Sequence, residues 1–287
     1  MMPSLPKLVA ALAAAVALAL LATGCGSTTS STPSTVAAAD CTPDKMQTQA
    51  PGELTVATDK PAYPPYFEDN DPTNGKGFES ATAYAIAHQL GYATSDVKWV
   101  TEPFNSSYAP GPKDFDFDVN QISITPAREQ HVDFSAPYYT ANQAVVATKG
   151  SSAASAKSLA DLKDASIGVQ IGTTSLDAVN SEIQPSSQPK VFNDSNDVVT
   201  ALKEGQVDAV VVDLPTALYL TAAQVPSATI VGQFSAPGGD QWGALLAKGS
   251  PLTGCVSDAI DELRSSGQLG KIENRWMSKA AQAPTLN

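Results

Sequence analysis

Strand-like and helix-like segments alternate along the chain from Leu54 onward, and this order limits the possible fold more than any other feature. Two of the strand segments, 167–170 (IGVQ) and 208–213 (DAVVVD), lack the polar/apolar alternation of a half-buried strand. Such runs are typical of strands that helices cover on both faces. The sequence therefore predicts an α/β fold of two doubly wound lobes, in which ligands bind beyond the carboxyl ends of the strands.

The N-terminal segment has the composition of an export signal followed by a linker. Residues 1–24 contain one lysine, an apolar run and then small residues, which is the form of a signal peptide. Cys25 follows directly, so we expect a lipoprotein with Cys25 lipidated at the mature N-terminus. The alternatives are an ordinary signal peptide with a chance cysteine, or a membrane anchor, although a spanning helix needs about 20 apolar residues and this run is shorter. Residues 25–50, rich in Ser, Thr, Pro and Ala, are predicted to be a flexible tether.

Charge and cysteine content narrow the function classes. The chain has 29 acidic and 17 basic residues, a net charge of −12, which argues against a nucleic-acid-binding protein. With Cys25 assigned to lipid, we expect Cys41 and Cys255 to form a disulfide that ties the start of the folded region to a helix near its end. The two histidines, His88 and His131, lie far apart, so neither a metal site nor a cofactor is expected.

The apolar residues change faces along the segment Phe115–Ile124. Those up to Val119 share one face of a strand, and those from Ile122 onward fall on the other. Because a slip of one residue moves a side chain to the opposite face, the strand is predicted to break or bulge near Asn120 and Gln121.

A helix start is predicted directly after this break, at Thr125-Pro126, with Arg128 in the first turn. A cation at that end opposes the helix dipole. The hydroxyl of Ser123, the free amides of the helix start and the guanidinium of Arg128 would be able to converge on one carboxylate. The alternative is a capped helix with a solvated arginine.

Two later strand ends also carry polar residues. Gln170 ends one strand, and Gly172, Thr173 and Thr174 turn from it into a helix whose unpaired N–H groups would bind an anion. Plain N-capping by threonine is the alternative there. Asp213 ends the other strand, where its carboxylate would either face the cleft and hold an ammonium group or cap the following helix.

The first strand ends at Asp59, ahead of a proline-rich turn that contains Tyr63. Together with Phe104, Tyr63 would supply apolar walls around a ligand, or else belong to a packed loop without a binding role. The segment Glu102–Lys113 contains three prolines and a glycine and is predicted to be a loop, not a helix.

Taken together, these segments resemble the periplasmic solute-binding proteins of polar amino acid ABC transporters, the group that contains the glutamine-, histidine- and lysine/arginine/ornithine-binding proteins. The resemblance extends from about Gly52 to Met277. It rests on six segments in the family's order: LTVATDKPAYPPYF, GFESATAYAIAHQLG, ISITPAREQHVDFSAPYYT, SLADLKDASIGVQIGTT, LKEGQVDAVVVDLPTALYL and KIENRWM. It implies the type II periplasmic-binding-protein fold.

The resemblance also assigns roles to the candidate residues. Arg128 and Ser123, with the backbone amide of Thr174, would bind the α-carboxylate of the ligand. Asp213 would accept the α-ammonium group. The other expected ligand contacts, by aromatic rings or by polar side chains, come from Tyr63, Phe104, Asp59, Gln121 and Gln170.

Ligand identity does not carry over, because the family usually has small residues where Asn120 and Gln121 stand. These two residues, with Asp59 and Gln170, would make a polar pocket that favours glutamine, asparagine or a cationic amino acid over glutamate. Alternatively, Asp59 caps its own turn and has no part in the choice.

The lobes implied by the resemblance are residues 51–140 with 241–287, and residues 141–240, joined near Tyr138–Gln143 and Gly238–Trp242. The implied function is capture of a polar L-amino acid between the closing lobes and its delivery to ABC permease subunits. We expect a monomer held by its lipid at the extracytoplasmic face of the membrane. Some relatives are cyclohexadienyl dehydratases, so an enzyme is one alternative and an amino acid sensor is another.

Overall fold

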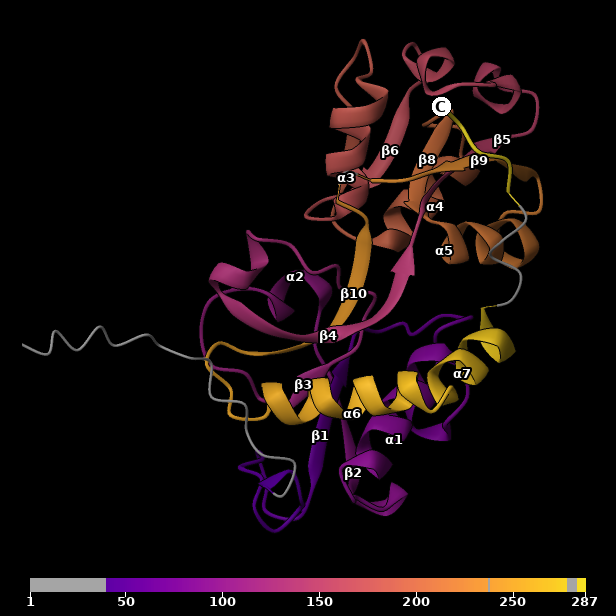
Figure 1. Cartoon of the computed structure of the whole chain (residues 1–287). Coiled ribbons are helices and arrows are strands. Elements are labelled where there is room, and N and C mark those ends of the chain that lie inside the picture. Colours follow the sequence, from indigo (N-terminus) through magenta and orange to yellow (C-terminus); the bar gives the residue numbers. More distant parts are fainter. Residues whose placement is uncertain (1–39, 237, 278–282) are drawn as a thin grey trace, which may run out of the picture. The chain divides into compact units, whose positions relative to one another are not determined.

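Two five-stranded sheets, each flanked by helices, form the framework of the protein (Figure 1). The structure, a computed structural model, describes residues 40–236, 238–277 and 283–287. The predicted signal peptide, the predicted lipidation site Cys25 and most of the predicted tether lie outside the described residues. The α/β architecture expected from the sequence is confirmed, and each sheet mixes parallel with antiparallel strands.

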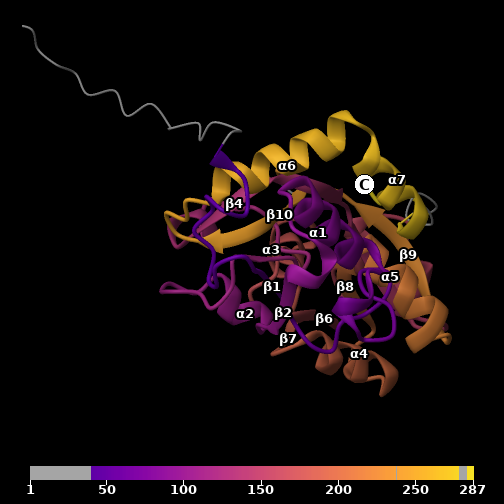
Figure 2. The ribbon, with the colours of Figure 1, turned by 90° about the horizontal axis from the view of Figure 1, so that it is seen from below.

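The first sheet is parallel in its first three strands and antiparallel where β10 joins it. Its strands, in spatial order, are β2 (Val97–Thr101), β1 (Leu54–Thr58), β3 (Phe117–Asp118), β10 (Asp240–Ala247) and β4 (Val132–Ala141). Three helices pack together beside this sheet (Figures 1 and 2): α1 (Phe78–Gln89), α6 (Thr253–Ser265) and α7 (Gln268–Trp276). A fourth, short helix is α2 (Phe104–Ser107). We call this part of the molecule the first lobe.

The second sheet carries the second lobe. Its strands, in spatial order, are β7 (Lys190–Phe192), β6 (Ile167–Gln170), β8 (Ala209–Asp213), β5 (Gln143–Thr148) and β9 (Ala228–Phe234). Its α-helices are α3 (Thr174–Ala178), α4 (Ser195–Lys203) and α5 (Leu214–Tyr219). Strand β6 is parallel to β7 and β8, whereas β5 is antiparallel to β8 and β9. Separate hydrophobic clusters lie on the two faces of this sheet, which explains why the interiors of β6 and β8 are apolar throughout.

The chain passes between the two sheets twice. Strand β4 of the first sheet ends at Ala141, and β5 of the second sheet begins at Gln143. The return runs from the end of β9 at Phe234 to the start of β10 at Asp240. The first residues of β5 and β10 therefore lie where the lobes are joined, next to the carboxyl end of β8.

Glycines fix both ends of α1. Gly77 has φ +98° and approaches the backbone of Tyr66 so closely that a Cβ atom would clash with it. Gly91, with φ +87°, follows the last turn, as the sequence predicts. This helix places the side chain of Glu79 in the buried interior of the first lobe.

The predicted disulfide between Cys41 and Cys255 is present and joins the start of the described chain to α6. The predicted tether extends to residue 50, but the structure packs residues 41–50 onto the first lobe. Met46 is buried, and the backbone N–H of Gln49 donates to Oδ1 of Asp116 at 2.8 Å. These contacts assign residues 41–50 to the first lobe and not to the predicted tether.

The C-terminal residues also depart from the sequence-based assignment, which placed them in the first lobe. Leu286 is buried against the second sheet, and its N–H donates to the carbonyl of Gln233 in β9 at 2.8 Å. A Cβ atom at Gly232 would clash with Leu286, so this glycine makes room for the terminus. Residues 283–287 therefore belong to the second lobe.

None of the helices within the described residues has the length and apolar character that crossing a membrane requires.

Candidate functional site

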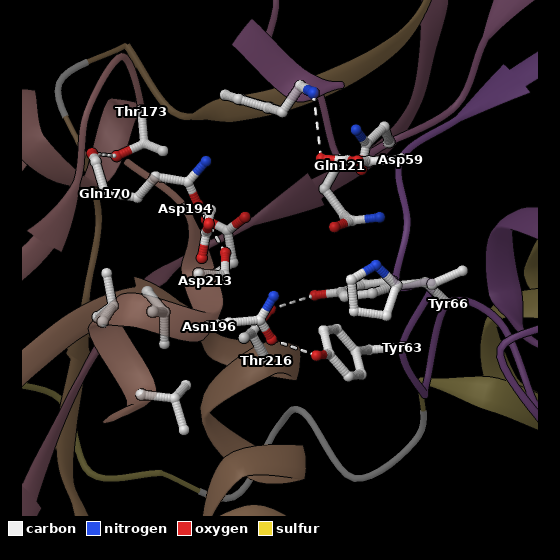
Figure 3. A pocket seen from close by; sticks show the side chains of 18 of the residues that line it. Asp59, Tyr63, Tyr66, Gln121, Gln170, Thr173, Asp194, Asn196, Asp213 and Thr216 are labelled. Atoms are coloured by element: carbon white, nitrogen blue, oxygen red, sulfur yellow. Dashed lines mark hydrogen bonds between the residues drawn. The ribbon is translucent and has the colours of Figure 1, made fainter. Parts of the chain in front are cut away.

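A pocket of about 420 Å³ lies between the lobes, at the carboxyl ends of β1, β6 and β8 (Figure 3). The residues predicted from the sequence to bind ligand all line this pocket: Asp59, Tyr63, Phe104, Gln121, Ser123, Arg128, Gln170, Thr174 and Asp213. The fold thus brings together residues that are spread over most of the chain. Their contacts with a ligand stay a prediction.

The strand break predicted near Asn120 and Gln121 is confirmed. Strand β3 ends at Asp118, earlier than the sequence suggests, and Gln121 has φ +50°, an uncommon value for a residue with a side chain. Ser123 then makes an isolated antiparallel bridge to Trp242 of β10. The break turns the chain so that Asn120, Gln121 and Ser123 all line the pocket.

The carboxylate of Glu79, in α1, stabilises this break through hydrogen bonds. Its carboxylate accepts hydrogen bonds from the backbone N–H of Gln121 at 2.7 Å and from the hydroxyl of Tyr138 at 2.5 Å, and it also accepts one from the side-chain amide of Gln121. Burial raises the pKa of Glu79 to about 7, while the bonds from Tyr138 and Gln121 oppose the increase. The side chain of Gln121 is therefore anchored to the first lobe.

Arg128 lies on a 3₁₀ turn, Arg128–Gln130, and not in the first turn of the α-helix that Thr125-Pro126 predicts. The hydroxyl of Thr125 accepts from the backbone N–H of Arg128 at 3.2 Å, but no α-helix follows. The prediction that free N–H groups of a helix start lie beside Arg128 is therefore wrong. The side chain is not solvated either. Arg128 is 7% exposed and donates to the carbonyls of Ser123 (2.6 Å) and Gly172 (2.9 Å), one in each lobe.

Two aromatic rings flank the guanidinium of Arg128. Its central carbon lies 5.4 Å from the ring centre of Phe104 and 4.7 Å from that of Tyr108, within the range of cation–π attraction. Phe104 begins α2, so the prediction of a loop without a helix at Glu102–Lys113 is wrong. The short helix places both rings beside Arg128.

The predicted turn before α3 forms as expected. Thr173 is the N-cap, and its hydroxyl accepts from the backbone N–H of Leu176 at 3.2 Å. Gly172 has φ +73°, and a Cβ atom there would clash with the hydroxyl of Tyr108. The hydroxyls of Thr174 and Ser123 lie 3.3 Å apart across the two lobes. The turn therefore meets the first lobe beside Arg128.

Asp213 occupies the N-cap position of α5, but its side chain makes no capping hydrogen bond, so the capping alternative is wrong. Its Oδ1 instead accepts from Nε2 of Gln143 at 2.7 Å. Burial, followed by the nearby charge of Asp240, raises the pKa of Asp213 to about 8. A cation in the pocket would stabilise the ionised carboxylate.

Three other predicted residues of the pocket, Asp59, Tyr63 and Gln170, make polar contacts of their own. Asp59 accepts from the backbone N–H groups of Lys60 (2.6 Å) and Phe104 (3.1 Å), as in the alternative in which it caps its own turn. Its part in the choice of ligand stays a prediction. The hydroxyl of Tyr63 donates to Oδ1 of Asn196 in the second lobe (Figure 3). Oε1 of Gln170 accepts from the hydroxyl of Ser195 at 2.6 Å. Aromatic rings, carboxamides and carboxylates therefore all line the pocket.

A comparison with protein families decides the affiliation of the chain. Residues 54–279 match the model of the bacterial extracellular solute-binding proteins, family 3. The chain belongs to this family.

Individual relatives agree with the family match. The arginine-binding extracellular protein ArtP of Bacillus subtilis is 29% identical over 218 residues, which cover 74% of this chain and 82% of ArtP. The L-cystine-binding protein TcyJ of Escherichia coli K12 is 29% identical over 220 residues, 75% of this chain and 79% of TcyJ. These relatives are named as binding proteins.

Solved structures share the fold. An ancestral arginine-binding protein bound to glutamine has a TM-score of 0.67 and 34% identity, and one bound to arginine has a TM-score of 0.66 and 35% identity. Each alignment covers 79% of this chain and 98% of the other. A third, an ancestral amino acid-binding protein described as a precursor of cyclohexadienyl dehydratase, has a TM-score of 0.64 at 31% identity and covers 78% and 96%. The type II periplasmic-binding-protein fold expected from the sequence is confirmed.

Several residues that line the pocket of this family member, or that contact its lining residues, were not predicted from the sequence. Tyr66 is buried, and its hydroxyl shares a hydrogen bond of 2.8 Å with the hydroxyl of Thr216 in the other lobe (Figure 3). Gln143, Asp240 and Tyr108 act on Asp213 or Arg128 from positions that are distant in sequence. The signal in the sequence was that Gln143 and Asp240 lie at the two predicted crossings between the lobes.

Within the described part of the chain, no group of three or more His, Cys, Asp or Glu side chains is arranged to hold a metal ion.

Proposed function

We propose that the protein captures a polar α-amino acid between its lobes and delivers it to the permease of an ABC transporter. The observation that carries the proposal is that the guanidinium of Arg128, from the first lobe, and the carboxylate of Asp213, from the second, line the same pocket. A zwitterion with its carboxylate toward Arg128 and its ammonium toward Asp213 would satisfy both charges. Relatives named for binding arginine, cystine, histidine and glutamine support an α-amino acid as the ligand.

The carboxylate end of the ligand would lie beside Arg128. A guanidinium has five N–H donors, and the carbonyls of Ser123 and Gly172 leave some of them for a ligand. The hydroxyls of Ser123 and Thr174, together with the backbone amide of Thr174, lie at the same junction of the lobes. A carboxylate bound there would contact both lobes and thereby stabilise the closed form.

The side chain of the ligand would extend toward Asp59, Tyr63 and Gln170. Carboxylates and carboxamide oxygens at this end accept hydrogen bonds, and the rings of Tyr63 and Phe104 provide flat apolar walls. We propose glutamine, asparagine or a cationic amino acid, whose side chains donate hydrogen bonds. The ancestral arginine-binding proteins solved with glutamine and with arginine support this class.

The cellular setting follows from the family and the N-terminal sequence. A protein lipidated at Cys25 would be held at the extracytoplasmic face of the membrane, where a monomer can meet the permease. The family description as extracellular solute-binding proteins supports export. No catalytic role is proposed, because the named relatives are binding proteins.

Isothermal titration calorimetry of the purified protein, freed of bound amino acid, tests the proposal. All twenty L-amino acids are titrated, together with analogues that lack the α-amine or the α-carboxylate. We expect saturable binding of one or a few polar amino acids and at least a tenfold loss for either analogue. Binding of a sugar or a dicarboxylate with no response to amino acids would contradict the proposal. Turnover of a cyclohexadienyl amino or keto acid would instead indicate the enzyme alternative.

A further inference from the structure

Gln143, the first residue of β5, is fully buried where the lobes are joined, and its side-chain amide contacts three side chains from different elements. Its Nε2 donates to Oδ1 of Asp213 at 2.7 Å and to Oδ2 of Asp240 at 2.7 Å. Its Oε1 accepts from the hydroxyl of Ser175 at 2.6 Å. Both amide hydrogens and the amide oxygen are therefore used, which leaves the side chain a single orientation.

The three partners of Gln143 have separate structural positions. Asp213 ends β8, and its Cα is paired with that of Gln143 in the antiparallel register of β5 and β8. Asp240 is the first residue of β10, the strand that returns the chain to the first lobe, and is 1% exposed. Ser175 is buried in the first turn of α3, directly after Thr174.

We propose that Gln143 and Asp240 are a positioning pair that orients the carboxylate of Asp213 toward the pocket. The pair also joins this carboxylate to the first turn of α3 and to β5 and β10, the strands that follow the two crossings between the lobes. The proposal rests on the proposed function, in which Asp213 receives the ammonium group of the ligand. Because the same amide contacts Ser175, a shift of Asp213 would be transmitted to the turn that carries Thr174. The ammonium end and the carboxylate end of the pocket are thereby coupled.

The carboxylate of Asp240 affects the ionisation of Asp213. Two carboxylates on one amide repel each other, and the charge of Asp240 adds to burial in raising the pKa of Asp213. Other groups also act on Asp213: Arg128 lowers its pKa, Glu79 raises it, and the hydroxyls of Tyr66 and Tyr139 lie within its electrostatic range. An ammonium group needs the ionised carboxylate, so its capture near neutral pH would release a proton from Asp213.

The test measures L-arginine and L-glutamine binding by calorimetry from pH 5.5 to 9, in buffers with different heats of ionisation. For the wild type we expect affinity to rise with pH and proton release at pH 7. In Asp240→Asn, the midpoint of this rise should move to lower pH by half a unit or more, and proton release at pH 7 should decrease. A merely structural role would lower the melting temperature without moving the midpoint.

Further variants separate positioning from stability. Gln143→Leu should weaken binding by about tenfold or more, and Ser175→Ala, a milder change that removes one hydroxyl, by a few-fold. Asp116→Asn is the matched control: Asp116 is also a buried aspartate, but its partners are the backbone N–H groups of Gln49 and Thr55, away from the pocket. Its pH midpoint should equal that of the wild type.

The outcomes distinguish the two proposals. If the wild type binds neither these amino acids nor any other, the proposed function fails. If it binds but Asp240→Asn and Ser175→Ala keep the wild-type pH midpoint and affinity, the positioning role of Gln143 and Asp240 is overturned.

Discussion

Asp59 and Asp213 stand at similar places in the two lobes: each lies at the carboxyl end of a strand, and each lines the pocket. Their surroundings differ. Asp59 accepts two backbone N–H groups and thereby holds its own turn and the start of α2. Asp213 accepts from the side chain of Gln143 and makes no capping bond to α5. A strand end brings a carboxylate to the pocket in both lobes, but only that of Asp59 is engaged by backbone N–H groups.

Replacing Asp213 should have the largest effect. Asp213→Asn keeps the size of the side chain and removes the charge that pairs with the ammonium, so affinity should fall by about 2–5 kcal/mol. Calorimetry with the preferred amino acid measures the loss. Because the pKa of Asp213 is raised, the neutral variant should not be less stable than the wild type at pH 8 in urea denaturation. Unchanged affinity would show that Asp213 does not hold the ligand.

The pH dependence of binding is the next largest effect. The pKa of Asp213 in the ligand-free protein is about 8, and bound ammonium requires the ionised form. Affinity should therefore decrease as pH falls below 8, by about ten- to fiftyfold between pH 8 and pH 6. Titrations across this range measure it, with Asp213→Asn as the control that should show a flatter profile. A wild-type affinity independent of pH would contradict the assignment.

Asp59 should matter more for stability than for binding. Asp59→Ala leaves the backbone N–H groups of Lys60 and Phe104 without their acceptor, which should lower the free energy of unfolding by about 1 kcal/mol. Affinity should change less than in Asp213→Asn. Urea denaturation and calorimetry on the same sample compare the two quantities. A loss of affinity as large as that of Asp213→Asn would remove the distinction between the two aspartates.

An effect on binding well below that of Asp213→Asn is expected for the hydrogen bond that joins the two lobes directly. Tyr66→Phe removes the hydroxyl that meets Thr216 of α5, so the closed form should lose about 0.5–1.5 kcal/mol of stability and affinity should fall accordingly. Tyr84→Phe is the matched control, since its hydroxyl bonds to Thr73 and Trp99 within the first lobe. Equal effects of both variants on binding would argue against a role in closure.

The same comparison explains what could be predicted from the sequence. The sequence places Arg128 after one predicted strand and Asp213 at the end of another. Because ligands bind beyond the carboxyl ends of strands in an α/β fold, their shared pocket was predictable. Gln143 and Asp240 were not, because both begin strands, and only the antiparallel pairing and the return of β10 bring them beside Asp213. The short helix α2 was missed for another reason. Its four residues lie between prolines, and its start is held by Asp59 from a distant part of the chain.

At Arg128 the structure also differs from what the neighbouring residues predict. Thr125-Pro126 is a good helix start, but the chain forms only a 3₁₀ turn before β4 begins at Val132. The break at Gln121, by contrast, was visible in the change of apolar faces. What sequence could not show is that Glu79, far away in α1, stabilises the break with two hydrogen bonds to Gln121.

The most direct test of the central claim combines a variant with an altered ligand. The affinity of wild type and of Asp213→Asn is measured by calorimetry for the preferred amino acid and for its analogue without the α-amine. If Asp213 accepts the ammonium, removing the amine should cost the wild type at least tenfold in affinity and cost Asp213→Asn far less. An equal loss in both proteins would contradict the account, because the amine would then be recognised elsewhere.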